Sequence, residues 1–542
     1  MLYNIIKIAV LFLSLNNVLG MSRVDPLVNT NLGLIRGLRA AGGDYSMFLG
    51  IPYAFVDDAN PFGPSIPVSQ FDDTFEAYDD SASCPQIEEF HNSIVGTLDC
   101  LHLNIYVPNS ASSRNLLPVL VWIHGGGFMS GSSGSYLYGP KYLVRHDVIL
   151  VTLNYRLGPY GFMCLNNTEI SGNQGLKDQV TALRWINTNI ESFGGDSSKI
   201  TIFGESAGGA SVDLHLFYNR ENLFQKVIMQ SGTSLSPWVI QEPDDNAPLK
   251  LAAKLGLTTT DVSEALQFLA KVDTNLVIAA TSALNLFFSP CIEYEFDNVD
   301  SFMIEHPINL NINKNIPVLL GYNNDEQLGF LVTQDQSYFE NSNMFFDFLN
   351  NHFSFDSAKL TEMEELLRHF YIGDQTATIE QLTNLIDFSS DINFVHPTER
   401  TIQKYMKEGV GTIYHYVFSY NGQRNFAKRS SNITEGGASH ADEISYLFDI
   451  SFWQEEPTCH DQMIINFMTT LWTNFAKHSN PTPQKNDLVW LPVTESTLYY
   501  LDINKHTSLK TRPFNDRMAF WDLFYKLNFK LQKEFKEMLT NN

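Results

Sequence analysis

The sequence predicts an α/β protein with a large, mostly parallel central sheet and helices on both faces. The apolar runs at 117–123 and 148–153 carry almost no polar alternation, which is typical of strands buried on both faces. A segment with apolar residues at helical spacing follows them at 178–193, before the next strand. Glycine-rich turns come directly after two of the expected strands. Such strand–helix alternation favours parallel pairing with covering helices.

The first half of the chain supplies most of the expected strands. After short alternating runs and turns at 30–110, we expect strands at 101–107, 117–123, 148–153, 200–203 and 226–230. The stretch 178–193 is predicted to be a helix, because Val180, Leu183, Ile186 and Ile190 recur at helical spacing.

The second half is less regular. Residues 240–310 and 330–410 favour helix, and we interpret them as excursions from the sheet that form a lid or pocket wall. Two closing strands and two helices are expected, at 316–320, 411–417, 464–475 and 520–542. No linker or internal repeat divides the chain, so residues 21–542 are predicted to form a single catalytic-type domain.

The composition fits a large globular protein, with 44% hydrophobic and 13% aromatic residues among 542. The net charge of −25 argues against nucleic acid or an anionic membrane surface as a partner. Residues 1–20 resemble a signal peptide, with Lys7 ahead of an apolar core too short to span a bilayer. No later stretch suits a membrane anchor, so we expect a secreted, extracellular protein.

Cysteines and glycosylation triplets fit that compartment. The chain has five cysteines, so at least one thiol stays unpaired. Cys84 and Cys100 are closest in sequence and are the best candidates for a disulfide-closed loop. The sequence leaves the pairing of the others open: Cys164, Cys291 and Cys459. Asn166 and Asn432 each begin an Asn-x-Thr triplet and are predicted glycosylation sites.

The chain is organised around one short turn, residues 204–208, which fits the pattern G-x-S-x-G. The turn follows the strand at 200–203 and precedes small residues that can begin a helix. Between a strand and a helix this pattern predicts a nucleophile elbow, with Ser206 on a sharp turn where neighbouring backbones come close. The helix N-terminus behind Ser206 favours negative charge. An ordinary Gly/Ser turn is the alternative interpretation.

A serine nucleophile needs a base, a carboxylate that orients the base, and N–H donors for the oxyanion. The turn His-Gly-Gly-Gly at 124–127 follows a buried strand and is a candidate donor loop. Asp325 and Glu326, after the strand at 316–320, are both candidate acids. His440, after the strand at 411–417, is the candidate base. The order serine, acid, histidine is typical of this elbow architecture.

Longer motifs are specific to one family. They are FLGIPYA (48–54), DCLHLN (99–104), VWIHGGGF (121–128), NYRLG (154–158), GNQGLKDQ (172–179) and GESAGG (204–209). On these motifs the chain resembles the carboxylesterase/cholinesterase (type-B) family of α/β-hydrolases over nearly the whole mature chain.

The resemblance implies the α/β-hydrolase fold and a serine esterase that uses no cofactor and no metal. It implies a catalytic triad of Ser206, Glu326 and His440, although Gln327 replaces the glycine that usually follows the acid. The remaining implied residues are the oxyanion donors Gly126, Gly127 and Ala207, the supporting hydroxyl of Ser231, and the disulfide Cys84–Cys100. Glu205, beside the serine, either orients a group near the triad or is a buried, hydrogen-bonded acid.

Within the family the chain is most similar to secreted moth and butterfly antennal esterases, some of which are thought to degrade odorant or pheromone esters. This implies a small apolar ester or a xenobiotic as substrate, and a monomer or weak dimer. The 84–100 loop contains no Trp to make a cation–π contact, which argues against acetylcholine. Trp238 suggests an apolar acyl pocket.

Two alternatives remain open at this point. Juvenile hormone esterases share the pattern Gly437-x-x-His440-x-x-Glu443, but they carry Gln where this chain has Glu205. A catalytically inactive binding or adhesion relative is the alternative outside enzymes, and it is disfavoured because such chains typically lack a member of the triad.

Overall fold

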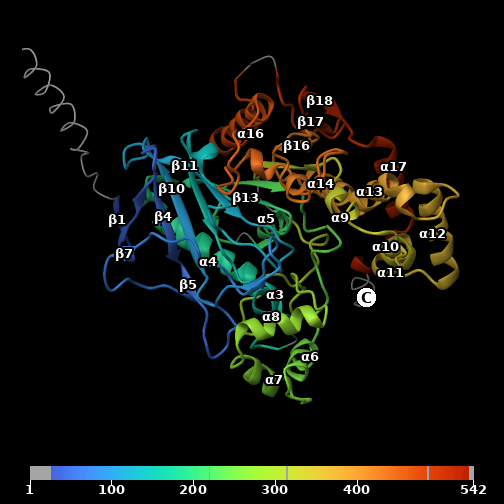
Figure 1. Ribbon diagram of the computed structural model, residues 1–542, viewed down its shortest axis with the longest axis horizontal. Coiled ribbons are helices and arrows are strands. Elements are labelled where there is room, and N and C mark those ends of the chain that lie inside the picture. Colours follow the sequence, from blue (N-terminus) through green and yellow to red (C-terminus); the bar gives the residue numbers. More distant parts are fainter. Residues whose placement is uncertain (1–25, 166, 219, 313–314, 485–487, 536–542) are drawn as a thin grey trace, which may run out of the picture.

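An 11-stranded sheet crosses the described part of the computed structural model (Figure 1). The structure describes residues 26–165, 167–218, 220–312, 315–484 and 488–535. The predicted signal peptide, residues 1–20, and the predicted glycosylation site Asn166 lie outside these ranges. The sheet includes strands from β3 near the N-terminus to β18 near the C-terminus, whereas the division of the chain into domains stays a prediction from sequence.

The strand order is β18-β17-β16-β15-β14-β13-β11-β12-β10-β4-β3. Neighbours from β12 across to β17 pair in parallel, and the pairs at both edges are antiparallel. The strands are β3 (Leu38–Arg39), β4 (Tyr45–Pro52), β10 (His102–Pro108), β11 (Leu117–Ile123), β12 (Ile149–Leu153), β13 (Gly195–Glu205), β14 (Lys226–Gln230), β15 (Val318–Asn323), β16 (Ile413–Phe418), β17 (Tyr499–Ile503) and β18 (Ser508–Thr511). The predicted α/β class is therefore confirmed.

Smaller sheets lie beside this one and contain the remaining strands. These are β1 (Leu27–Thr30), β2 (Gly33–Arg36), β5 (Ala54–Phe55), β6 (Ile66–Pro67), β7 (Phe75–Glu76), β8 (Gln86–Ile87) and β9 (Ile94–Val95). The β8–β9 pair lies inside the short loop between Cys84 and Cys100.

Helices lie on both faces of the central sheet and beyond its edge (Figure 1). They are α2 (Lys141–Val144), α3 (Gly158–Phe162), α4 (Gln174–Asn189), α5 (Ala207–Tyr218), α6 (Ala247–Lys254), α7 (Val262–Leu269), α8 (Thr274–Ala283), α9 (Leu328–Leu331), α10 (Gln336–Asn341), α11 (Met344–His352), α12 (Ser357–Ile372), α13 (Leu382–Ser390), α14 (His396–Glu408), α15 (Phe426–Ser430), α16 (Cys459–His478) and α17 (Asn515–Leu527). No helix among the described residues is both long and apolar enough to cross a membrane.

Alternate side chains of each strand enter different cores. Val119 and Val121 of β11 pack in one cluster with α4 and α5, whereas Leu120 and Trp122 pack in a second cluster with α2 and α16. This is the alternation expected of a strand that is covered on both faces. It explains why the sequence of β11 shows a continuous apolar run.

A third core cluster joins α9–α13 to α17, beyond the edge of the sheet in Figure 1. The region predicted to favour helix at 330–410 is thus helical, with a core of its own around Phe348, Phe388 and Trp521. A π-helix, η3 (Asp391–Val395), lies directly between α13 and α14.

Two expectations about the C-terminal part are wrong. The strands at 316–320 and 411–417 do not close the sheet, because β17 and β18 continue it beyond β16. The helix expected at 520–542 begins earlier, at Asn515, and ends at Leu527. The amide of Asn528 donates to Phe524 O and that of Gln532 to Tyr525 O, so side chains satisfy the last carbonyls and the helix stops there.

A buried ion pair joins the motif at 154–158, which follows β12, to the motif at 172–179, which leads into α4. Arg156 Nε and Nη2 donate to the two carboxylate oxygens of Asp178 at 2.7 and 2.8 Å. Arg156 Nη1 also donates to the carbonyl oxygens of Pro61 and Gly63, at 3.1 and 2.6 Å. Both charged side chains are 0% exposed. Removing one partner would leave an uncompensated buried charge.

We therefore expect Asp178→Ala to destabilise the protein by about 3–5 kcal/mol. The matched control is Glu221→Ala, which breaks the solvent-exposed pair of Arg184 and Glu221 and should cost about 1 kcal/mol or less. Thermal unfolding midpoints of the two variants, measured side by side, check this. Equal midpoints would contradict a structural role for the buried pair.

Candidate active site

Ser206 lies at the centre of the parallel sheet, between β13 and α5. Its backbone has a φ of 57°, in the left-handed region, and its side chain is only 9% exposed. A Cβ built on Gly204 or Gly208 would lie 2.6 or 2.0 Å from the carbonyl oxygen of Ile123. A side chain fits at neither position, so this sharp turn requires glycine at both.

The glycine loop after β11 lies directly against the elbow. A Cβ on Gly125 would come within 3.1 Å of the Ser206 Cβ. Gly126 and Gly127 have φ values of 103° and 60°, which favour glycine. Within the described residues, the backbone N–H groups of Gly126, Gly127 and Ala207 donate to no protein acceptor. Three donors beside one serine hydroxyl can hold an oxyanion.

Glu326 and His440 meet beside the elbow, although they come from turns after different strands. His440 Nδ1 lies 2.6 Å from Glu326 Oε2, and Glu326 Oε1 accepts the backbone N–H of Asn323 at 2.7 Å. The alternative acid, Asp325, instead accepts the backbone N–H of Gly437 at 2.7 Å. The geometry therefore pairs the imidazole with Glu326 and not with Asp325.

The other nitrogen of His440 faces the elbow. Its Nε2 lies 3.2 Å from Glu205 Oε1, the residue just before Ser206. Among the described residues no hydrogen bond joins Ser206 Oγ to His440. Glu326 thus orients the imidazole through Nδ1, and Nε2 faces the turn that carries Ser206. Catalytic hydrogen bonds often tighten only when substrate is bound.

The charge of His440 depends on its carboxylate neighbours. Burial alone would lower the pKa of His440, but the carboxylates of Glu205 and Glu326 outweigh it and raise the pKa to about 10. Burial also raises the pKa of Glu205 well above its usual range, although His440 opposes this effect. The resting site therefore favours one proton held between Glu205 and His440.

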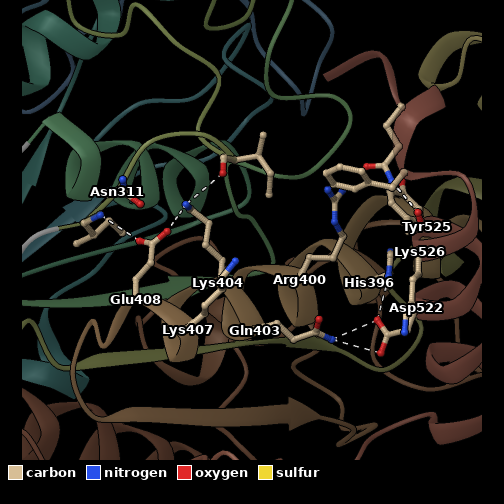
Figure 2. Close-up of a pocket in the computed structure, with 14 residues that line it drawn as sticks. Asn311, His396, Arg400, Gln403, Lys404, Lys407, Glu408, Asp522, Tyr525 and Lys526 are labelled. Carbon is tan, nitrogen blue, oxygen red and sulfur yellow. Dashed lines mark hydrogen bonds and ion pairs between the residues drawn. The ribbon is translucent and has the colours of Figure 1, made fainter. Parts of the chain in front are cut away.

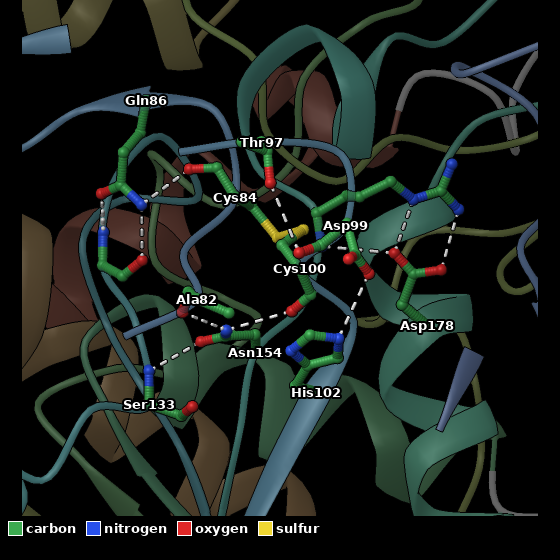
Figure 3. Close-up of a disulfide and its surroundings, with 12 residues drawn as sticks. Ala82, Cys84, Gln86, Thr97, Asp99, Cys100, His102, Ser133, Asn154 and Asp178 are labelled. Atoms are coloured by element: carbon green, nitrogen blue, oxygen red, sulfur yellow. Dashed lines mark hydrogen bonds and ion pairs between the residues drawn. A yellow bond between two sulfur atoms is a disulfide. The ribbon is translucent and has the colours of Figure 1, made fainter. Parts of the chain in front are cut away.

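The disulfide loop braces the glycine loop. Cys84 and Cys100 form a disulfide (Figure 3), and Gln86, two residues after Cys84, reaches Gly131. The Gln86 amide donates to Gly131 O at 2.8 Å, and Gly131 N donates to Gln86 Oε1 at 2.6 Å. The Ser130 hydroxyl lies 2.5 Å from Glu89 Oε1. The contacts at Ser130 and Gly131 fix the glycine loop, whose glycines would otherwise be mobile.

A buried polar network beside Glu326 was not apparent from the sequence. Glu443 accepts hydrogen bonds from the amides of Gln230 and Asn323, at 2.9 and 2.7 Å. Trp472 Nε1 in turn donates to Gln230 Oε1 at 2.9 Å. The only available signal was the position of Glu443 three residues after His440. The other members of this network come from β14, β15 and α16, and no local sequence pattern connects these elements.

Aromatic side chains line one side of the site. The ring of Phe394, in the π-helix η3, lies 4.6 Å from the His440 ring, and Trp238 lies 5.9 Å from Phe394. Phe128, after the glycine loop, is 6.3 Å from Trp238. On the other side of the loop, a Cβ on Gly127 would lie 3.9 Å from the Phe287 ring. The site therefore has an apolar wall.

A second disulfide, Cys164–Cys291, anchors the segment that carries Phe287. The side-chain amide of Asn173 pairs with the backbone of Cys291 in both directions, at 2.9 Å each. The sequence could not assign this pairing, because the two cysteines are 127 residues apart. Cys459 is left as an exposed free thiol among the described residues.

The remaining candidates take less direct positions. Ser231 has a left-handed φ of 49° and is fully buried, and its hydroxyl has no hydrogen-bond partner among the described residues. Its backbone N–H donates to Gly321 O at 2.9 Å. Asn432 is exposed, as a glycosylation site must be. A supporting role for Ser231 and glycosylation of Asn432 stay predictions.

The carboxylesterase family model matches residues 24–521, and the chain belongs to this family. It is 31% identical to juvenile hormone esterase of Heliothis virescens, over 91% of this chain and 93% of that protein. It is 33% identical to bile salt-activated lipase of Homo sapiens, over 92% of this chain and 68% of that protein.

Among solved structures, juvenile hormone esterase from Manduca sexta, with OTFP covalently attached, matches with a TM-score of 0.82 at 28% identity. The match covers 93% of this chain and 100% of that one. The fold is thus the α/β-hydrolase fold, and the protein is a serine hydrolase of carboxylic esters. The juvenile hormone esterase and the bile salt-activated lipase are similar to this chain at nearly the same sequence identity. Sequence identity alone therefore does not identify the ester substrate.

The Glu205 contact predicts a pH effect. Only neutral His440 can accept a proton, so the raised pKa should place the acid limb of the kcat/KM profile above the ordinary histidine value of about 6.5. Glu205→Gln removes a carboxylate that raises this pKa, and should move the acid limb to lower pH by about one unit or more. pH–rate profiles of both proteins test this. An unmoved limb would show that Glu205 does not set the basicity of His440.

The brace predicts a second effect on turnover. Gln86→Ala should lower kcat about tenfold with a smaller change in KM, because misplaced oxyanion donors weaken transition-state binding more than substrate binding. Gln462→Ala, on the exposed surface of α16, is the control and should leave both constants unchanged. Steady-state kinetics on one ester suffice. A change confined to KM would rule out a positioning role for Gln86.

Proposed function

We propose that this protein is a secreted serine carboxylesterase that cleaves apolar esters with Ser206, His440 and Glu326. The observation that carries the proposal is the position of His440. Its Nδ1 is held by Glu326 at 2.6 Å, and its Nε2 faces the elbow. Orientation of the base by a carboxylate is what an activated serine requires.

In the proposed first half-reaction, His440 Nε2 takes the proton of Ser206 Oγ, and the oxygen attacks the ester carbonyl. The N–H groups of Gly126, Gly127 and Ala207 hold the oxyanion that forms. The imidazolium then gives its proton to the departing alcohol, and the acyl group remains on Ser206. Each oxyanion donor and the base contribute factors of about 10² to 10⁴.

Water completes the reaction in the second half. His440 removes a proton from water, the hydroxide attacks the acyl-enzyme, and the acid leaves as Ser206 regains its proton. Glu326 orients His440 and stabilises the imidazolium. The reaction uses side chains and water alone, and the proposal includes no cofactor.

Export is supported by the two disulfides, since such bonds persist mainly in oxidising compartments. The signal-like residues 1–20 and the exposed Asn432 triplet agree with it. The proposed assembly is a monomer or weak dimer.

The apolar wall supports the choice of substrate. The ring of Phe394 contacts the His440 ring and is itself contacted by Trp238, so an apolar acyl or alcohol group beside His440 would be desolvated. Odorant or pheromone esters and apolar xenobiotics fit this wall. A pocket of about 70 Å³ beside Glu205, far below the range of about 300–1,000 Å³ typical of ligand sites, disfavours a bulky group on that side.

Juvenile hormone esterase is the second candidate. The similarity to two proteins of that name supports it, and so does Glu443, which contacts the triad through Asn323. Glu205 counts against it, because those enzymes carry Gln before the serine. The discriminating measurement compares kcat/KM for juvenile hormone with kcat/KM for acetates of increasing alcohol length. A clear preference for the hormone would overturn the odorant or xenobiotic proposal.

The triad proposal has a direct test. Ser206→Ala should lower hydrolysis of p-nitrophenyl acetate at least about 10⁴-fold while the thermal midpoint is retained. Ser263→Ala, on the exposed surface of α7, is the matched control. An organophosphate should label Ser206 with one equivalent. Full turnover by the Ser206→Ala protein would refute the triad, and an inert wild type that binds esters without product would favour the inactive binding relative.

A further inference from the structure

A second cleft lies beside α14 and α17. It has a volume of about 800 Å³ and is bounded by α14, α17 and the segment at 308–312 (Figure 2). None of the residues that line it is a candidate catalytic residue. Its size is within the range of about 300–1,000 Å³ typical of small-molecule sites.

The charge of this cleft is the reverse of that of the whole protein. The chain has 60 acidic and 35 basic residues, but the cleft is lined by more basic than acidic side chains. The basic ones are Arg400, Lys404, Lys407 and Lys526, and the acidic ones are Glu408 and Asp522. Such a local excess in an acidic protein favours an anionic ligand.

The acidic side chains are already paired. Glu408 binds Lys404, and Asp522 accepts from the amide of Gln403 at 3.2 Å. Arg400, in turn, pairs with Glu534 from outside the lining. Lys407 and Lys526 are the cations of this lining that have no partner among the described residues. Figure 2 shows them on α14 and α17, on opposite sides of Arg400.

One buried polar atom in the lining lacks a hydrogen bond. Gln532 is 3% exposed, and its Oε1 has no hydrogen-bond partner among the described residues. His396 is 2% exposed, and its Nε2 lies 3.5 Å from Asp522 Oδ1 (Figure 2). Buried polar atoms are almost always satisfied, by protein, water or ligand, so Gln532 Oε1 is an exception in this lining.

Apolar surface completes the lining. Ile308 and Ile312 form part of one wall, and the ring of Tyr525, under the Arg400 guanidinium at 4.5 Å, forms part of another. A hydrocarbon chain placed here would leave water, which contributes about 25 cal/mol per Å² of apolar area buried. Free cations beside apolar walls suit a ligand with one charged end.

We propose that this cleft binds an amphiphilic carboxylate, with the carboxylate at one of the unpaired lysines, Lys407 or Lys526, and the hydrocarbon chain against the apolar lining at Ile308, Ile312 and Tyr525. Acids of this kind are the products of carboxylic ester hydrolysis, so the family activity supplies the ligand class. The acid is bound and not consumed. The site can therefore be tested whether or not the proposed triad is correct.

The experiment measures binding of dodecanoate to the full-length protein by isothermal titration calorimetry. Wild type should bind it saturably, with the cleft site present once per chain. Lys407→Glu/Lys526→Glu should weaken that binding at least about tenfold, since the attraction between the carboxylate and a free lysine becomes repulsion. Lys407→Met/Lys526→Met should weaken it less, because the apolar stems remain. Lys254→Glu/Lys271→Glu, which reverses two exposed lysines of the α6–α7 region, is the matched control and should bind as wild type.

Two further probes separate head group from chain. Dodecanol lacks the charge and acetate lacks the chain, so each should bind more weakly than dodecanoate. A dodecanoate that carries a photoreactive diazirine should label peptides of α14 and α17. Absence of saturable binding, equal binding by the glutamate variant, or labelling confined to the elbow region would each overturn the proposal.

Discussion

The left-handed backbone of Ser206 is the constraint on which the site depends. A residue with a side chain held at such a φ costs of the order of 1–3 kcal/mol, and it persists only where the surroundings enforce it. Here three neighbours do so. The Ser206 N–H donates to Gln230 O at 2.8 Å, a Cβ on Gly232 would lie 2.0 Å from Ser206 O, and Gly125 packs against the Ser206 Cβ. The parallel register of β11, β13 and β14 brings all three together.

The same sheet geometry gathers carboxylates around one imidazole. Glu205 is the last residue of β13, Glu326 follows β15, and Glu443 contacts β14 through Gln230 and β15 through Asn323. Only Glu326 is oriented by a backbone N–H on one oxygen and by His440 Nδ1 on the other. Glu205 has no hydrogen bond of this kind and contacts the opposite nitrogen. The two acids therefore differ in role because they differ in hydrogen bonding, although both are buried.

The sequence was sufficient for the parts of the fold that local patterns encode. A continuous apolar run located β11 to the residue, the strand expected at 226–230 matches β14, and the glycine spacing located the elbow. The sequence could not tell whether Asp325 or Glu326 is the acid that contacts His440. Both follow the same strand, and the directions of their side chains are set only in the folded chain. The structure separates them, because Asp325 is used by the backbone of Gly437.

Contacts between distant segments were beyond what the sequence could predict. The pairing of Cys164 with Cys291, and the reach of Gln86 to Gly131, depend on loops that meet only in the folded chain. The strand β17 was missed for a related reason. It is five residues long and is stabilised by pairing with β16 and β18, so its own sequence carries little signal.

One helical segment connects the candidate active site to the second cleft. Phe394 contacts the His440 ring, and His396, two residues later, lines the cleft. Residues two apart on a helix point to nearly opposite sides, so one segment can face both sites. Phe394 lies in the π-helix η3, which ends one residue before His396, and Asp391 within η3 is held by Tyr371 and Arg517. π-Helices are uncommon and are frequent at functional sites. The aromatic contact on the base thus depends on the same segment that carries the cleft lysine Lys407.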